Sequence, residues 1–290
     1  MKKFTLIKLV KKILTIVWRL ICFIRLKFLG SKSKSYFSIP QFSIGDATVL
    51  KVLLNRLPPQ NKNIKILEVG SWMGNGSTII LGEFAKERDG MLYCVDTWRG
   101  SLVEKSHNTS IQSHDIYGTF EYNIQGRGLE KYVKPLIMPS SEACEILRDN
   151  YFDFIFIDGD HTYEIVKQDI LNFSKKLRSD GILCGHDCSG LMDDFEPSII
   201  NENLTSGTFK NSQYPRGILP GVIKAVSEVF GSNNSLTIWT KIDLRTEQGE
   251  LLSTVSTERG KINDDSFVMP LGLEETSSIW SVTLEGDVQL

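Results

Sequence analysis

The chain of 290 residues is 41% hydrophobic, 10% aromatic and 23% charged. These proportions exclude an intrinsically disordered chain, a collagen-like repeat and a protein with several membrane spans. The formal net charge is −2, so the protein as a whole is not expected to bind nucleic acid or another polyanion. The five cysteines are too few and too irregularly spaced for a disulfide framework, which favours a reducing, cytoplasmic compartment.

Residues 1–30 differ from the rest in charge, because they carry eight basic side chains and no acidic one. On a helical wheel Lys8, Lys12, Thr15 and Arg19 share one face, and apolar residues cover much of the remainder. We therefore expect a basic amphipathic helix that lies on the anionic inner face of a membrane, placing the protein at the membrane periphery. A single spanning anchor and a helix that packs against protein are the alternatives, and Arg19 disfavours spanning.

The rest of the chain divides by composition into three parts. Residues 31–60 form a linker and a leading helix, residues 61–245 alternate between strands and helices, and residues 246–290 are a C-terminal extension expected to complete the sheet. Within the middle part, residues 189–218 have a loose pattern that is typical of a lid or acceptor loop. The predicted strands are 64–69, 91–95, 133–138, 152–157, 181–185, 236–241 and 279–284. The predicted helices include 46–57, 77–86, 119–123, 141–149, 163–177 and 219–230.

Strands that alternate with helices predict an α/β fold with a doubly wound, parallel sheet. The run from Phe152 to Ile157 is almost purely apolar, as expected for a central strand that is buried on both faces. Ligands of such sheets bind outside the carboxyl ends of the strands.

A glycine-rich turn follows the first of these strands, where residues 66–77 read ILEVGSWMGNGS. A phosphate-binding P-loop would place its second glycine at Asn75, and a dinucleotide fingerprint would need glycines at Trp72 and Asn75. Neither spacing fits, so what remains is an acidic residue, Glu68, followed by Gly70 and Gly74.

This pattern resembles the first motif of class I S-adenosylmethionine-dependent methyltransferases, and it is especially similar to the subgroup called methyltransferase domain 24. VDTWRG at 95–100, FDFIFIDGDHTY at 152–163 and GHD at 185–187 resemble that subgroup too. The resemblance covers about residues 60–240, and sugar O-methyltransferases such as the macrocin enzymes are relatives. It implies a Rossmann-like seven-stranded sheet with helices on both faces, S-adenosylmethionine as cofactor, and methylation of a hydroxyl on a sugar, glycan or secondary metabolite.

The resemblance also implies a set of cofactor-binding residues, which are Glu68, Gly70, Ser71, Gly74, Ser77, Asp96, Trp98, Ser140 and Asp158. Glu68 would organise the methionine end, Asp96 would accept from the ribose hydroxyls, and Trp98 and Ser140 would meet the adenine. Structural roles stay open for four of them. Glu68 and Asp96 could cap a turn or helix, Trp98 could pack in the core, and Ser140 could cap the helix after it.

Acidic and histidine side chains follow two neighbouring strands, as Asp158-Gly-Asp160-His161 and as His186-Asp187. Adjacent parallel strands end at one edge, so we expect these groups to meet. A neutral imidazole suits removal of a proton from an acceptor hydroxyl. The resemblance assigns this role to His161 and implies catalytic positions for Asp158 and Asp187, which would hold a divalent cation such as Mg²⁺.

Departures and alternatives remain at this cluster. Cys188 stands where related enzymes have a second oxygen ligand, and the spacing of Cys184 and Cys188 permits a zinc site. Asp160 could cap the following helix, and either histidine could be structural.

Other functions are also open. The fold could serve as an inactive cofactor-binding scaffold at a membrane, and hydroxylation ranks lower because no iron site of two histidines and a carboxylate is evident. His107, His114, Tyr117 and the loop 189–218 could line the pocket for a small-molecule or glycan acceptor.

Overall fold

A computed structural model describes residues 41–239 without 102, 104, 216 and 232–234, and also 244–245, 251–253 and 277–283. The predicted N-terminal helix and most of the C-terminal extension lie outside these described residues. Of the helices in the described part of the chain, none combines the length and hydropathy that a membrane crossing requires.

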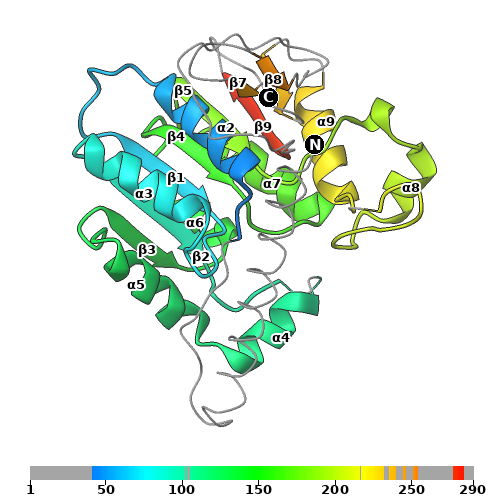
Figure 1. Ribbon diagram of the computed structural model, residues 1–290, viewed down its shortest axis with the longest axis horizontal. Helices are drawn as coiled ribbons and strands as arrows, with labels where there is room; N and C mark the ends of the chain where they lie inside the picture. The colour runs from blue at the N-terminus through cyan, green and yellow to red at the C-terminus, as the bar shows by residue number, and fades with distance from the viewer. Residues whose placement is uncertain are drawn as a thin grey trace, which may run out of the picture.

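Seven strands form one sheet in the order β3-β2-β1-β4-β5-β9-β6 (Figure 1). They are β1 (Lys65–Val69), β2 (Met91–Asp96), β3 (Val133–Ile137), β4 (Phe152–Ile157), β5 (Leu177–Gly185), β6 (Thr237–Trp239) and β9 (Ile279–Thr283). The first five strands are parallel, and β9 runs antiparallel to both β5 and β6. The predicted seven-stranded α/β sheet is thus confirmed, with one strand reversed. A separate pair is formed by β7 (Leu244–Arg245) and β8 (Leu251–Ser253).

Helices cover both faces of the sheet (Figure 1). Those described are α2 (Ile44–Asn55), α3 (Ser77–Glu87), α4 (Lys105–Ser113), α5 (Ile116–Gly126), α6 (Ser140–Ile146), α7 (Tyr163–Ser174), α8 (Pro197–Glu202) and α9 (Pro220–Phe230). Apolar residues of α2, α3 and α5 share a core with one face, and those of α6, α7 and α9 share a core with the other.

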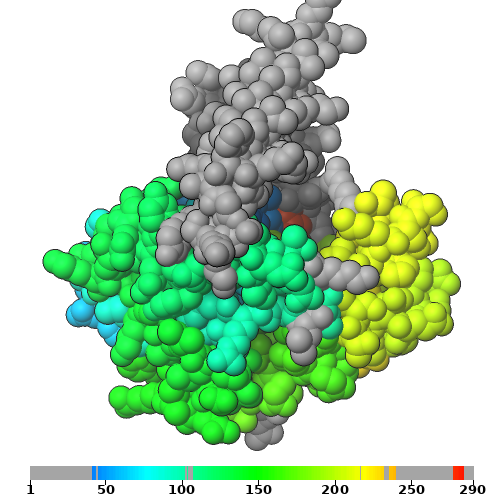
Figure 2. Space-filling view, turned by 90° about the horizontal axis from the view of Figure 1, so that it is seen from below, coloured from blue at the N-terminus to red at the C-terminus, as the bar shows by residue number. Residues whose placement is uncertain are grey.

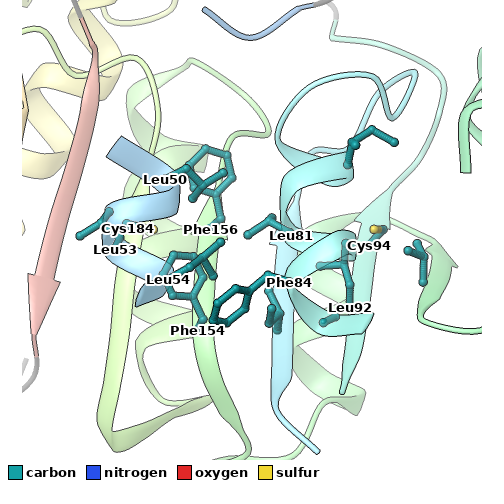
Figure 3. Packing of buried hydrophobic residues seen from close by; sticks show 14 of the residues in the cluster. Leu50, Leu53, Leu54, Leu81, Phe84, Leu92, Cys94, Phe154, Phe156 and Cys184 are labelled. Carbon is teal, nitrogen blue, oxygen red and sulfur yellow. The ribbon is translucent and has the colours of Figure 1, made fainter. Parts of the chain in front are cut away.

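Strand β4 shows why a doubly covered sheet needs a continuous apolar run. Phe154 and Phe156 point to the face that α2 and α3 cover, where Leu54 and Phe84 lie close to them in Figure 3. Ile155 belongs to the opposite core with α7 and α9. Successive side chains of a strand alternate between faces, so every position of β4 is buried.

Some predicted boundaries are wrong. Helix α6 ends at Ile146 instead of residue 149, and β5 begins at Leu177 instead of residue 181. Helix α7 ends at Ser174, whereas the apolar period of the sequence predicts a helix that continues to Leu177. Leu177 instead begins β5 and pairs with Phe152, across a register irregularity between Phe152 and Phe154. Leu177 therefore belongs to the sheet, although its position also fits the apolar period of the helix.

The segment 189–218 contains a 3₁₀ turn (η1, Met192–Asp194), helix α8 and an antiparallel bridge between Phe209 and Ile218. It has a small core of its own and joins α9 in a lobe at one side of the molecule (Figure 2). The lobe is tied to the start of α7 because Tyr163 N–H donates to the Leu204 carbonyl (3.0 Å). At the start of α9, Gly221 leaves no room for a Cβ beside the backbone of His161.

The strand order reverses between β1 and β4, whose carboxyl ends pair Val69 with Ile157. In open α/β sheets a ligand crevice forms at this reversal. The glycine turn after β1 and the acidic motif after β4 both begin there.

Candidate active site

The glycine turn is fixed against the end of β4. Gly70 has φ +89°, and a Cβ there would overlap the backbone of Asp158. The Gly70 N–H donates to the Val95 carbonyl (2.9 Å), and the Asp158 N–H donates to the Val69 carbonyl (2.7 Å). Glycine is therefore required at position 70 by both conformation and space.

Glu68 lies beneath this turn and is fully buried. Its carboxylate accepts hydrogen bonds from the hydroxyls of Ser71 (2.6 Å), Ser77 (2.6 Å) and Thr78 (2.7 Å). Burial raises the pKa of Glu68 to about 7, although these hydroxyl donors favour the charged form. Hydrogen bonds among Glu68, Ser71 and Ser77 thus hold the turn in place from inside the protein. None of the three residues lines the cavity described below.

Asp96 ends β2 and holds the turn from the other side. The backbone N–H groups of Ser71 and Trp72 donate to its Oδ2 (2.9 and 2.8 Å), and that of Trp98 donates to Oδ1 (2.6 Å). Burial raises the pKa of Asp96, and the amide donors oppose that rise. Asp96 also lines the cavity, so its contact with a ribose stays a prediction.

A cavity of about 230 Å³ opens at the carboxyl ends of β1, β2, β3 and β4. Its lining residues are Val69, Gly70, Trp72, Val95, Asp96, Thr97, Gly100, Ser101, His107, Met138, Pro139, Ser140, Asp158, Gly159, Asp160, Ile165 and Asp169. Four of them are aspartates, and this lining includes no lysine or arginine among the described residues.

The two tryptophans near the cavity have different positions. Trp98 is buried against Tyr117 and Phe120, with ring centroids 5.0 and 4.9 Å away, and its Nε1–H donates to the Trp72 carbonyl (2.7 Å). The structure therefore places Trp98 in the core, the alternative that the sequence left open. Trp72 lines the cavity instead, with its ring stacked on that of His107 at 4.2 Å.

Gly74 also lies outside the lining, and a Cβ there would overlap the ring of Phe120. Ser140 does line the cavity, at the first position of α6, with Pro139 as the N-cap residue. Its hydroxyl hydrogen-bonds to Asp169, a carboxylate on α7 that is 3% exposed and has a pKa raised to about 7 by burial. Sequence reasoning missed Asp169, since a polar residue beside apolar helical neighbours is typical of a solvated face.

Asp158, His161, His186 and Asp187 meet at the ends of β4 and β5, and we call them the acid–histidine cluster. Nε2 of His161 lies 3.0 Å from Oδ2 of Asp187. Nδ1 of His186 lies 3.2 Å from Oδ1 of Asp187 and 3.6 Å from Oδ1 of Asp158. Asp187 has φ +65°, an uncommon conformation for a residue with a side chain, which costs about 1–3 kcal/mol.

Charge and burial oppose one another in the acid–histidine cluster. Burial favours the neutral form of Asp187, yet the adjacent imidazoles hold its pKa well below the usual range. Burial likewise opposes charge on His186, but the two carboxylates raise its pKa well above normal. Burial raises the pKa of Asp158. Asp187 is therefore the anion of the cluster, and His186 is its cation.

The cluster also contains atoms that could hold a metal ion. Asp158, His161 and Asp187 each offer one ligand atom, and these atoms lie within 4.8 Å of one another. Two carboxylates with an imidazole fit a divalent cation of the Mg²⁺ or Mn²⁺ kind, although a nitrogen ligand is less typical of Mg²⁺.

Cys188 and Cys184 contribute nothing to this donor set. The Cys188 thiol donates to the Gly190 carbonyl (3.2 Å), and burial raises its pKa to about 12. A thiol must be deprotonated to bind zinc, so the zinc alternative does not fit. Cys184 is fully buried on β5, and its thiol donates to the Ile155 carbonyl (3.4 Å).

Asp160 is not the N-cap of α7, because Thr162 occupies that position. Its Oδ1 instead accepts from the N–H and hydroxyl of Thr162 (2.7 and 2.6 Å), which shapes the turn that carries His161.

Residues 67–188 match the family model of a methyltransferase domain. The matched segment includes the glycine turn, the Asp96 strand end and the whole acid–histidine cluster. This segment of the chain is a methyltransferase domain.

Solved structures of other proteins are similar at low identity. One is an O-methyltransferase from Bacillus cereus in complex with SAH, 16% identical over 84% of this chain and 83% of that one, with a TM-score of 0.45. Another is cofactor-bound Rv0187 from MTB, 15% identical over 86% and 85% of the two chains, with a TM-score of 0.46.

Proposed function

We propose that this methyltransferase transfers its methyl group to a hydroxyl of a small-molecule acceptor, either a sugar or glycan precursor or a secondary metabolite. The single observation that carries the proposal is the contact between His161 Nε2 and Asp187 Oδ2 (3.0 Å) at the edge where Asp158 lines the cavity. An alcohol becomes a competent nucleophile when a base removes its proton, and an imidazole oriented by a carboxylate is suited to that task. His161 is the base, and Asp187 orients it.

The charge of the cavity supports its use as the cofactor site. S-adenosylmethionine carries a sulfonium and an ammonium group, and a lining with four aspartates attracts cations while it repels phosphates. Asp96 and Ser140 would hold the ribose and adenine, with the turn at Gly70 beside the methionine end. When bound, the cofactor supplies an electrophilic methyl group for in-line displacement by the acceptor oxygen.

A divalent cation, with Mg²⁺ as first candidate, is a second part of the proposal. Asp158 and Asp187 would hold it, and their closeness to one another supports this placement. When bound, such a cation lowers the pKa of a contacting hydroxyl. His161 would then serve as base or as a third ligand, and the two roles exclude one another at the same nitrogen.

Transfer of labelled methyl from S-adenosylmethionine to small-molecule and glycan fractions tests the proposal. We expect products with methyl ethers, and His161→Gln should lower kcat by roughly 10²- to 10⁴-fold without changing cofactor affinity measured by calorimetry. His114→Gln is the matched control, because His114 lies outside the cavity lining and contacts Ser113 and the Ser110 carbonyl.

Each part of the proposal has an outcome that removes it. Full activity of His161→Gln would remove the base, and full activity in EDTA would remove the cation. Cofactor binding without transfer to any hydroxyl would favour a binding scaffold.

The location of the acceptor is the last part. The basic, acid-free segment 1–30 supports peripheral attachment to an anionic membrane surface, where a lipid-linked glycan precursor would be presented.

A further inference from the structure

Asp46 connects a helix outside the matched domain to the acid–histidine cluster. It lies in the first turn of α2, after the N-cap Ser43, and is only 6% exposed. Its Oδ1 accepts from the N–H of Ser278 (3.0 Å), and its Oδ2 accepts from the Ser43 hydroxyl (2.5 Å) and lies 3.2 Å from Nε2 of His186. A buried carboxylate is costly unless it is paired, and here one of its partners is an imidazole of the acid–histidine cluster.

The ring of His186 is held from all sides. Nε2 faces Asp46 and the Ser278 hydroxyl (3.1 Å), and Nδ1 faces Asp187 and Asp158. The ring also lies against Phe42, with centroids 5.2 Å apart. Because a carboxylate only accepts hydrogen bonds, both ring nitrogens of His186 carry protons, Nε2–H toward Asp46 and Nδ1–H toward Asp187.

A continuous chain of contacts therefore runs from Asp46 through His186 and Asp187 to His161. We propose that Asp46 is a positioning residue for methyl transfer: it fixes the His186 ring, which aligns Asp187 and through it the base His161. This rests on the proposed function. Asp46 reaches the base through two intervening side chains, His186 and Asp187. Residues that orient reacting groups through hydrogen bonds typically alter activity 10- to 100-fold when they are changed.

The test compares Asp46→Asn with Asp153→Asn in the full chain. Asp153 is also 6% exposed and pairs with Arg178 (2.9 Å) and the N–H of Lys65 (2.7 Å), away from the site. We expect Asp46→Asn to lower kcat 10- to 100-fold with unchanged affinity for S-adenosylmethionine, since Asp46 does not line the cavity. Asp153→Asn should leave kcat unchanged. An unchanged kcat in Asp46→Asn, or an equal loss in both variants, would overturn the proposal.

A second measurement does not depend on activity. The chain has four histidines, so long-range ¹H–¹⁵N spectra can resolve every ring. We expect Asp46→Asn to shift the ring nitrogens of both His186 and His161 and to leave those of His107 and His114 in place. A shift at His186 without one at His161 would refute transmission to the base. If the wild type transfers no methyl group while these shifts occur, the proposed function fails and the positioning contact stands.

A third variant covers the case in which Asp46→Asn does not fold. Ser278→Ala removes the hydroxyl contact to Nε2 but keeps the backbone N–H that donates to Asp46. We expect a smaller kcat loss in the same direction, with the His161 signals shifted. Wild-type kcat and unshifted signals would count against the proposal.

Discussion

Glu68→Gln should change how the stability of the protein depends on pH. In the folded chain burial raises the pKa of Glu68 to about 7, against 4.5 for an ordinary glutamate. The folded state therefore binds this proton more tightly than the unfolded state does. The stability that results is fully present below pH 4.5 and is lost as the pH rises through 7. Glutamine is uncharged, so the variant lacks this component.

The expected magnitude follows from the two pKa values. One pKa unit corresponds to 1.36 kcal/mol, so a gap of about 2.5 units makes ionised Glu68 cost the folded state about 3 kcal/mol. The hydroxyls of Ser71, Ser77 and Thr78 already favour the charged form, and their effect is included in the raised value. Relative to Glu68→Gln, the wild type should lose about 2–3 kcal/mol of unfolding free energy between pH 5 and pH 8, because a part of the full difference is already lost below pH 5.

Denaturant unfolding at pH 5, 6, 7 and 8 measures this difference directly. Groups other than Glu68 titrate in both proteins, so subtracting one curve from the other isolates its contribution. Parallel curves across the whole range would show that Glu68 does not gain a proton on folding and would refute the role of burial at this position.

Three further predictions concern the turn, the tryptophans and the N-terminal segment. Gly70→Ala should weaken S-adenosylmethionine binding at least tenfold by calorimetry, because its Cβ would displace the Asp158 backbone, whereas Gly126→Ala, with open space around it, should bind normally. Trp72→Ala should weaken cofactor binding with little loss of stability, and Trp98→Ala should cost about 3–5 kcal/mol in denaturant unfolding, as expected for a buried aromatic. The reverse order of effects would contradict the assignment of Trp72 to the cavity. Deleting residues 2–29 should abolish sedimentation with anionic phospholipid vesicles, and retained binding would remove this segment as the membrane contact.

The strands themselves could be located because each is marked by its own composition. Continuous apolar runs such as Phe152–Ile157 occur where both faces are covered, and the motifs at their ends identified the ligand edge. The first residues of β5, from Leu177 to residue 180, could not be predicted. Leu177 fits the apolar period of the preceding helix as well as it fits a paired position in the sheet.

The site was predictable where chemistry follows a strand end and not where it depends on distant segments. Asp158 and Asp187 come directly after their strands, and the fold brings them together. Asp46 and Asp169 lie on helices, where a carboxylate is normally solvated, so only the tertiary structure reveals that they are buried. Trp72 and Trp98 both lie beside the glycine turn, and the sequence does not distinguish them. The hydrogen bond that Trp98 Nε1–H donates to the Trp72 carbonyl holds Trp98 in the core.

The lack of a side chain at Gly221 has a consequence for any exchange of the segment 189–218, the proposed acceptor loop, between related proteins. The backbone at Gly221, at the start of α9, packs directly against the backbone of His161. The Leu204 carbonyl accepts a hydrogen bond from the N–H of Tyr163. A grafted segment 189–218 would therefore have to preserve both of these contacts. A chimaera that replaces Gly221 by a larger residue would move the histidine together with the new loop, so specificity and rate would change at once.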